Sequence, residues 1–418
     1  MKEKIRLTQT KDVFWNMLGG GIVALQSAVL LIFVARFYSQ DTAGIVSISY
    51  AFAVLAFTIA RYGIRNYQVT DQENEYSFKE YLMARYISVA VTVLAICIYL
   101  AIQTATGSYT LNKSLIVLEI VLLRMVNAIE DVFLGRFQQV GKFGIGAKIM
   151  AVRETFLLLL LILLLVMKID IRIAVGIGII FSTLVDVIYI SERKEDLNLG
   201  DSIQRKANSK AIGRLLKENF PLCIGTGLAV YASNIPKYTT DWYLDEYSQA
   251  VVAYLILPVF TIALFSQFAY TPFVKDLGEA YHSENKKSFL KKIRFQILFT
   301  AGVAIVICAV CLSIGLPILS YVYNIDLSVH RLEFVLLLVG GTLYALEYYL
   351  SIPVTIMHKQ KQLGIGYALA IVIAAITQRR IVTDLGIMGV CILYCVTNLV
   401  ILLFFSAVVI MDLKTRKK

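Results

Sequence analysis

A few charged side chains stand inside long apolar stretches of this 418-residue sequence. Arg124 is followed by Asn127 and Asp131 at i+3 and i+7, a spacing that puts the three on one face of a helix. A charge inside a membrane-spanning helix costs roughly 2.5 to 3.5 kcal/mol on insertion scales, so such residues are candidates for a functional site. The alternative is that Arg124 pairs with Asp131 or Glu119 on its own helix, or with Glu154 nearby, and fixes the helices to one another.

A second apolar stretch carries Arg153 and Glu154, a little more than one turn after Lys148. Arg153 has the same two interpretations as Arg124: a cation that meets an anionic ligand, or one partner of a structural ion pair. Both arginines are the strongest candidates for a binding site.

Other charged and polar residues give weaker signals. Arg61 lies at the end of a stretch, as do Arg36, Arg65 and Lys237, and there a long cationic side chain usually extends to the membrane surface. Asp186 lies toward a helix end, where coupling to a cation gradient competes with ordinary pairing. Side chains that could line an internal cavity are Gln26, Asn127, Asp131, Asn234, Gln267, Glu347 and Asn398.

The composition explains why these few charges matter. Apolar and aromatic residues make up 58% of the chain and charged residues 17%, against about 25% charged in an ordinary soluble domain, and the mean hydropathy is +0.72. One or two soluble cores could not bury that much apolar surface. The sequence therefore predicts an all-α, polytopic membrane protein, and argues against a secreted disulfide scaffold, a nucleic-acid-binding domain and a cytosolic enzyme.

The apolar stretches are long enough to cross the membrane as helices, which need about 17 to 25 residues each. Helices are favoured because lipid offers no partner to an open backbone amide and no alternating ten-residue pattern suggests a barrel. The twelve predicted spans are 13–35, 43–62, 82–103, 114–134, 148–167, 171–191, 216–236, 249–271, 293–316, 332–353, 364–379 and 385–411.

The distribution of positive charge predicts the orientation. With both termini inside, and with residues near a span end counted with the adjoining loop, 30 of the 40 Lys and Arg residues fall in inward regions and 8 in outward loops. The remaining two, Arg124 and Arg153, lie deeper within spans. Inward loops of membrane proteins are enriched in Lys and Arg, so this orientation is preferred over the opposite one. The +11 net charge is thus an orientation signal rather than a nucleic-acid-binding surface.

Cysteine and histidine suggest no cofactor, metal site or disulfide. All six cysteines fall inside predicted spans, and Cys308 and Cys311, although spaced C-x-x-C, have no histidine nearby. The three histidines lie in or beside loops, so no intramembrane histidine is available for acid–base chemistry.

The chain also shows signs of an internal duplication. Asn16 and Asn219 precede the first and seventh spans, Ser39-Gln40 and Ser248-Gln249 introduce the next ones, and a G-I-G triplet at 144–146 and 364–366 follows the fourth and tenth. We therefore predict an N-terminal six-helix lobe (1–195), a polar inward loop (196–215) and a C-terminal six-helix lobe (216–418). Parallel repeats of this kind leave a cleft between them.

At the level of whole stretches, the sequence resembles a known family. The start NMLGGGIVALQSAVLLIFVARFYSQDTAGIVSISYAF, the ARYGIRNY segment and IVTDLGIMGVCILYCVTNL resemble polysaccharide-biosynthesis flippases of the multidrug/oligosaccharidyl-lipid/polysaccharide (MOP) exporter superfamily. Many relatives carry an acidic residue in a segment of the form A-D-F-G, whereas here Arg61 and Tyr62 precede Gly63. No residue role is therefore transferred to that position from the family.

The resemblance implies an exporter in the bacterial cytoplasmic membrane that moves an undecaprenyl-diphosphate-linked oligosaccharide for O-antigen, capsule or similar synthesis. Its partners would be the lipid-linked substrate, membrane lipid and the polysaccharide polymerase or assembly machinery. On this interpretation Arg124 and Arg153, with Lys148 and Arg61, meet the diphosphate, because an arginine fork matches phosphate oxygens.

Two other classes compete with the flippase. A drug or cation antiporter of the same superfamily would be expected to carry an acid in the first span, and there is none between Val13 and Ala35. A membrane enzyme would need a large outward loop or an intramembrane histidine, and neither is found. The sequence therefore favours the flippase over the antiporter, and both over an enzyme.

The orientation makes a direct prediction. In a variant without its native cysteines, Ser202→Cys should be protected from an impermeant thiol reagent in intact cells, because Ser202 lies in the longest inward loop. Glu246→Cys lies in an outward loop and should react. Labelling in the reverse order would overturn the orientation and the direction of transport.

Overall fold

The computed structural model describes residues 2–71, 73–197, 207–259, 262, 273–283 and 286–415, and within these ranges every regular element is helical. The predicted all-α fold is confirmed. The chain divides into two compact units, Met1–Gly227 (unit 1) and Leu228–Lys418 (unit 2), with the division inside helix α9 (Ser209–Ser233). The predicted lobe boundaries at 195 and 215 stay a prediction.

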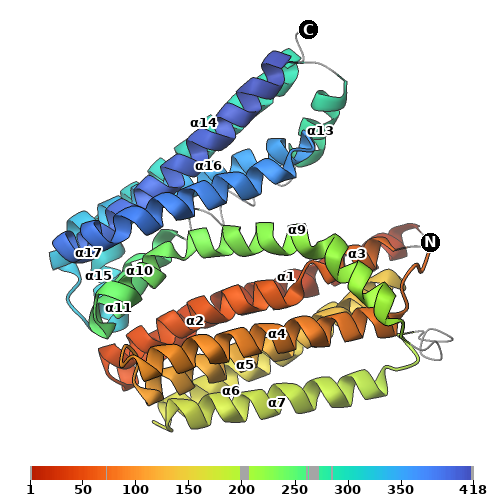
Figure 1. Ribbon diagram of the computed structural model, residues 1–418, viewed down its shortest axis with the longest axis horizontal. Helices are drawn as coiled ribbons and strands as arrows, with labels where there is room; N and C mark the ends of the chain where they lie inside the picture. Colours follow the sequence, from red (N-terminus) through yellow and green to blue (C-terminus); the bar gives the residue numbers. More distant parts are fainter. Residues whose placement is uncertain are drawn as a thin grey trace. The chain divides into compact units, whose positions relative to one another are not determined.

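Unit 1 is a bundle of long helices that lie side by side (Figure 1). Besides the first part of α9 it contains α1 (Lys2–Phe37), α2 (Gln40–Arg61), α3 (Ile64–Thr70), α4 (Phe78–Ala105), α5 (Leu111–Gln139), α6 (Phe143–Val166) and α7 (Ile171–Glu192). Helix α5 contacts α2, α3, α4, α6 and α7. It is therefore the central helix of the unit.

Short polar residues at the loops set where these helices begin. Ser39 Oγ accepts the Thr42 amide at the start of α2, and Ser77 and Glu80 form a reciprocal capping box at the start of α4. These bonds satisfy backbone donors that the first turn of a helix leaves open. In the second unit Asp245, rather than Ser248, caps α11 (Glu246–Leu255), so the two Ser-Gln pairs of the predicted repeat do not occupy equivalent positions.

Unit 2 is built on the contacts of α16 with α14 and α17, and on α10 against α17. Its helices are α10 (Ile235–Tyr243), α11, α13 (Val274–His282), α14 (Lys286–Val310), a π-helical turn (Cys311–Gly315), α15 (Leu316–Tyr323), a 3₁₀ turn (Ser328–His330), α16 (Arg331–Ile356) and α17 (Gln360–Thr415).

Helix α17 covers two of the predicted spans. It folds back at Gly386, whose φ of 57° and ψ of −134° are outside the helical region and are adopted almost exclusively by glycine. As a result the two halves run antiparallel, with Tyr367 of the first half packed edge-on against Phe405 of the second at 5.5 Å. The last predicted hairpin is thus present as two spans joined at a glycine.

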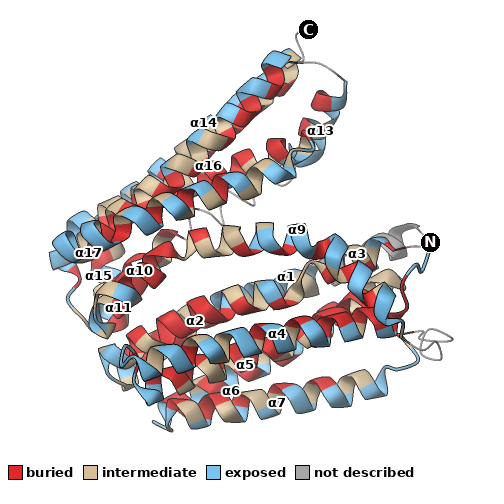
Figure 2. Ribbon diagram, in the orientation of Figure 1, coloured by how far each residue is buried: buried red, intermediate tan, exposed pale blue. Residues whose placement is uncertain are grey.

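Eight helical segments among the described residues are long and apolar enough to cross a membrane, α17 counting as one of them. Helix α5 is not in this set because six of its residues are charged, although most of the helix is buried (Figure 2). The predicted span 249–271 lies partly outside the described residues. Together with the folded-back α17, these segments are consistent with the predicted twelve spans.

The close contact of α16 with α17 generates a stability prediction. A Cβ on Gly340 would lie 2.5 Å from the ring of Tyr394, so Gly340→Ala should force the helices apart and destabilise unit 2 by roughly 1 to 3 kcal/mol. Gly302→Ala in α14, with no atom within 4 Å, is the matched control and should not lower stability. Thermal unfolding of both variants in the same detergent checks this; equal melting temperatures would contradict the contact.

Candidate functional site

Two groups of ion pairs meet on helix α5, at the adjacent residues Glu130 and Asp131. Each of these two residues is 4% exposed. Neighbouring residues on a helix do not face the same way, so each carboxylate meets a different set of arginines. We call the two groups the Arg153 network and the Asp131 cluster.

The Arg153 network joins α5, α6 and α7 in the interior of unit 1. Arg153 Nη2 lies 2.7 Å from Glu130 and 2.6 Å from Glu154, and its Nη1 lies 2.7 Å from Asp186. Asn127 donates to the same Glu154 oxygen at 2.7 Å. Three carboxylates therefore share one guanidinium, whose side chain is fully buried.

In this structure Arg153 has the partners of a structural ion pair, and its role in binding an anionic ligand stays a prediction. Its guanidinium is enclosed by acids from three helices, which is the structural alternative, and an added anion would be repelled by the surplus of carboxylates. Asn127 is likewise engaged within the network rather than at a pocket.

The Asp131 cluster has the opposite balance of charge. Arg85 and Arg65 bond its two oxygens at 2.9 and 3.1 Å, and Arg61 lies at 3.4 Å. Arg85 also donates to the Ala60 carbonyl and Arg65 to Gln138. One carboxylate thus holds three guanidinium groups together, leaving an excess of two positive charges.

The cluster borders a pocket of about 110 Å³, lined by Thr58, Arg61, Gly63, Arg65, Asn66, Asp131, Leu222 and Thr226. The side chain of Arg85 is fully buried behind it, whereas that of Arg61 is 39% exposed and that of Arg65 19%. The excess positive charge is therefore accessible on Arg61 and Arg65, and an anion is the ligand that the pocket favours.

A break between two helices separates these two arginines of the pocket lining. Helix α2 ends with Tyr62 in the left-handed region, at φ 53°, and Gly63 follows at φ 71° before α3 begins. The chain redirects between Arg61, the last residue of α2, and Arg65 in α3. Because α2 and α3 both pack on α5, the two side chains converge on Asp131.

The loop after α3 is fixed by Asp71. Its carboxylate accepts the amides of Glu75 and Tyr76 and the hydroxyl of Tyr81. Burial and the neighbouring Glu218 raise the pKa of the Tyr76 hydroxyl, which stays a neutral donor to Glu218. This loop anchors α3, and with it Arg65, against the start of α4.

Arg124 lies elsewhere in unit 1, without an ion pair among the described residues. Its Nη2 donates to the Val23 carbonyl at 3.3 Å and its guanidinium lies 5.7 Å from the ring centre of Tyr50. Of the acids predicted as its partners, Glu119 pairs with Arg172 instead, while Glu154 and Asp131 belong to the two groups above. A binding role for Arg124 stays a prediction.

The other predicted residues are divided between the two units. Lys148 is exposed beside the Trp15 ring, and Gln26 is fully buried with both amide atoms lacking a partner among the described residues. In unit 2, Asn234 and Asn398 donate to carbonyls of their own helical turns, and Glu347 is 2% exposed. Gln267 lies outside the described residues.

Sequence reasoning missed Arg85 and Glu130 and treated Arg65 as a surface residue. Arg85 stands four residues into the predicted span 82–103, so its depth was a usable signal of an intramembrane charge. Glu130 adjoins Asp131 in the charged part of α5. For Arg65 no such signal existed, because a position beyond the end of a span is also typical of a cation at the membrane surface.

The Arg153 network predicts a large loss of stability on removal of its cation. Arg153→Gln leaves three buried carboxylates without their shared partner, and breaking a buried pair in this way costs about 3 to 5 kcal/mol. Arg172→Gln, which removes a partly exposed pair with Glu119, should cost at most about 1 kcal/mol. The yield and melting temperature of folded protein in detergent measure both; an Arg153→Gln protein as stable as the control would contradict the network.

Comparisons with known proteins agree with this architecture. The family described as polysaccharide biosynthesis protein matches residues 9–254, more than half of the chain. No curated protein matches in sequence. The chain does match solved structures over nearly its whole length.

Three of these structures illustrate the fold. An inward-facing multidrug resistance MATE family transporter of the MOP superfamily aligns with a TM-score of 0.73 and 12% identity, over 96% of this chain and 95% of its own. The lipid II flippase MurJ, in an inward closed conformation, gives 0.69 and 14%, over 96% and 87%. The Vibrio cholerae MATE transporter VcmN, in the bent form, gives 0.58 and 12%, over 97% and 96%.

At these identities the structures establish a shared fold. With the apolar helices they show a multi-pass membrane protein with the fold of MOP-superfamily transporters. With the sequence match over more than half of its length, the chain belongs to the polysaccharide biosynthesis protein family.

Proposed function

We propose that this protein is a flippase that moves an undecaprenyl-diphosphate-linked oligosaccharide across the bacterial cytoplasmic membrane, for the synthesis of O-antigen, capsule or a similar surface polymer. The family match and the fold shared with transporters, one of them a lipid II flippase, support a membrane flippase or exporter. The identity of the substrate rests on the chemistry of unit 1.

The observation that carries the proposal is the Asp131 cluster beside its pocket. A diphosphate brings about two negative charges, and the three arginines exceed the one carboxylate by two positive charges. Arginine presents donors in a planar fork that matches phosphate oxygens in a bidentate way, and it keeps its charge at any accessible pH. The sign of the charge and the arginine donors of the pocket lining therefore support a diphosphate as the ligand.

The members of the cluster have different roles in this proposal. Arg85 is buried and bonded to Asp131 and the Ala60 carbonyl, so it positions the carboxylate. Arg61 is the most exposed of the three and lies at the longest distance from Asp131, which leaves its donors available for phosphate. Asn66 and Thr58 line the same pocket and add neutral hydrogen-bonding groups for a sugar.

Localisation and partners follow from the same proposal. The charge distribution along the sequence supports two cytoplasmic termini, so substrate is loaded from the inner side. Beyond the lipid-linked oligosaccharide and membrane lipid, the polymerase or assembly machinery that consumes the exported unit is a further partner.

A drug or cation antiporter of the same superfamily is the alternative. The specific observation in its favour is the Arg153 network, in which three buried carboxylates share one arginine and so leave capacity for a proton or another cation. The two functions are separated by expression in a flippase-deficient strain and in a drug-sensitive strain: restored surface polymer supports the flippase, and drug resistance without polymer supports the antiporter.

The proposal predicts a graded response at Arg61. Arg61→Gln removes both the charge and the fork and should reduce surface polymer in a flippase-deficient strain at least tenfold, since charge-assisted hydrogen bonds contribute about 1.5 to 3 kcal/mol. Arg61→Lys keeps the charge alone and should be intermediate.

Protein abundance is matched by immunoblot. The control is Arg172→Gln, which removes the partly exposed ion pair between α7 and Glu119 of α5, outside the Asp131 cluster, and this variant should export normally. Normal export by Arg61→Gln and by Arg65→Gln at full abundance would remove the cluster from the substrate path.

A further inference from the structure

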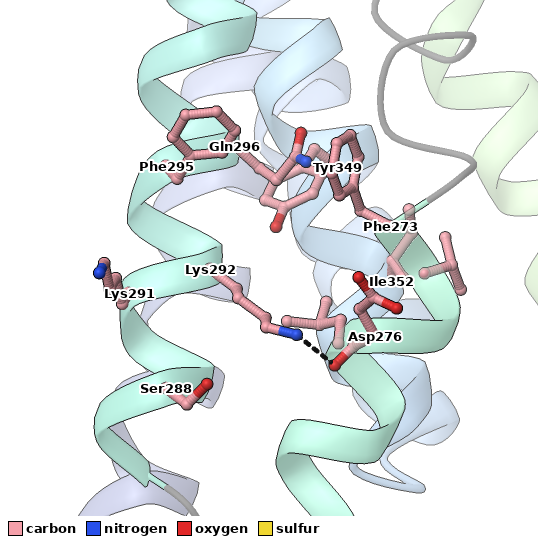
Figure 3. A pocket seen from close by; sticks show the side chains of 11 residues that line it. Phe273, Asp276, Ser288, Lys291, Lys292, Phe295, Gln296, Tyr349 and Ile352 are labelled. Atoms are coloured by element: carbon pink, nitrogen blue, oxygen red, sulfur yellow. Dashed lines mark hydrogen bonds between the residues drawn. The ribbon is translucent and has the colours of Figure 1, made fainter.

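Unit 2 contains a pocket that the proposed transport site does not use. It has a volume of about 370 Å³, within the range of small-molecule sites, and lies among α13, α14 and α16 (Figure 3). Its lining residues are Phe273, Val274, Asp276, Leu277, Ser288, Lys291, Lys292, Phe295, Gln296, Tyr349 and Ile352. Most of this surface is apolar.

Both cationic residues of the lining come from the beginning of α14. Lys292 reaches across the gap between α14 and α13, where its Nζ donates to the Asp276 carbonyl at 3.0 Å, whereas the Lys291 side chain points to the other side of α14 (Figure 3). With the Asp276 carboxylate also in the lining, the net charge is +1. The pocket therefore suits a single negative charge better than a diphosphate.

A buried acceptor gives a second, independent indication of a ligand. Gln296 lies one turn beyond Lys292 on α14, is 3% exposed, and its Oε1 has no hydrogen-bond partner among the described residues. A buried amide oxygen without a donor is destabilising, so the site favours a ligand that brings a hydroxyl or amine to this position.

The pocket also offers apolar surface to a ligand. Phe273 and Phe295 line the pocket and are 45% and 56% exposed, which leaves two aromatic faces for an apolar chain. Basic pockets between membrane helices on the inner side are places where anionic lipid head groups bind. Lys291 and Lys292 belong to the region that the charge distribution assigns to that side.

We propose that this pocket binds one anionic phospholipid of the surrounding membrane, with its phosphodiester at Lys292 and in the positive field that Lys291 adds, a head-group hydroxyl donating to Gln296 Oε1, and an acyl chain along Phe273 and Phe295. A phosphodiester carries the one negative charge that the lining matches. Phosphatidylglycerol, which adds head-group hydroxyls, is the probe with this chemistry.

Native mass spectrometry of the purified full-length protein tests the proposal, with phosphatidylglycerol or phosphatidylcholine added at equal concentration. One phosphatidylglycerol should be retained preferentially. Lys291→Gln and Lys292→Gln should each weaken that retention about fivefold, the effect expected of one lysine near an anionic lipid. Gln296→Leu should weaken it as well, while Lys287→Gln, on the same helix outside the pocket, should not.

A second variant separates a defined pocket from general attraction to a basic surface. Val274→Trp fills the apolar part and leaves every lysine in place, so it should abolish the preferential retention. Lipid retention is compared only for variants whose melting temperature equals that of the unsubstituted protein. Equal retention of both lipids, retention unaffected by Val274→Trp, or stronger retention of undecaprenyl phosphate in direct competition would overturn the proposal.

Discussion

The burial of two adjacent carboxylates on α5 is the constraint on which unit 1 depends. A helix that carries two buried carboxylates is stable at the centre of an apolar bundle only if those carboxylates are paired there. Glu130 and Asp131 project in different directions, and each is met by arginine from neighbouring helices. The positions of α2, α3, α4, α6 and α7 around α5 thus follow both from apolar packing and from the need to bring these partners together.

The two groups solve that requirement in opposite ways. Around Arg153 the acids are in excess and the cation is fully enclosed, which makes the network a means of holding α5, α6 and α7. Around Asp131 the arginines are in excess and two of them reach a pocket. The Arg153 network and the Asp131 cluster are adjacent along α5. A substitution in one of them is therefore expected to affect the other through this helix.

Unit 2 is stabilised mainly by close packing of its helices. Gly340 allows α16 to approach Tyr394 of α17, and Gly386 lets α17 turn back on itself. Among its described residues only Glu347 and Asp412 are buried charged residues, so close helix contacts between small and aromatic residues supply its stability, as is common for membrane bundles. The polar exception is the end that carries α13 and the start of α14, where lysines, Gln296 and exposed aromatic rings surround a pocket.

Much of this architecture could be predicted from the sequence because it depends on sums over many residues. Hydropathy over twenty-residue stretches determines which segments become membrane helices, and the asymmetry of Lys and Arg predicts their orientation. The stretches that resemble polysaccharide flippases identified the superfamily. The positions of Arg124, Arg153 and Asp131 within apolar stretches also indicated that α5 and α6 carry charged residues, and all three are buried. These properties are local or additive, so no contact had to be known.

Only the tertiary structure decided which charges pair. Arg153 has an acid beside it in sequence, but its enclosure requires Glu130 and Asp186 from two other helices, 23 and 33 residues away. Arg61, Arg65 and Arg85 come from α2, α3 and α4, and nothing in their spacing shows that one carboxylate of α5 gathers all three. The physical reason is that the sign and accessibility of a site depend on the balance of charges from several helices, and that balance is fixed only when the helices pack.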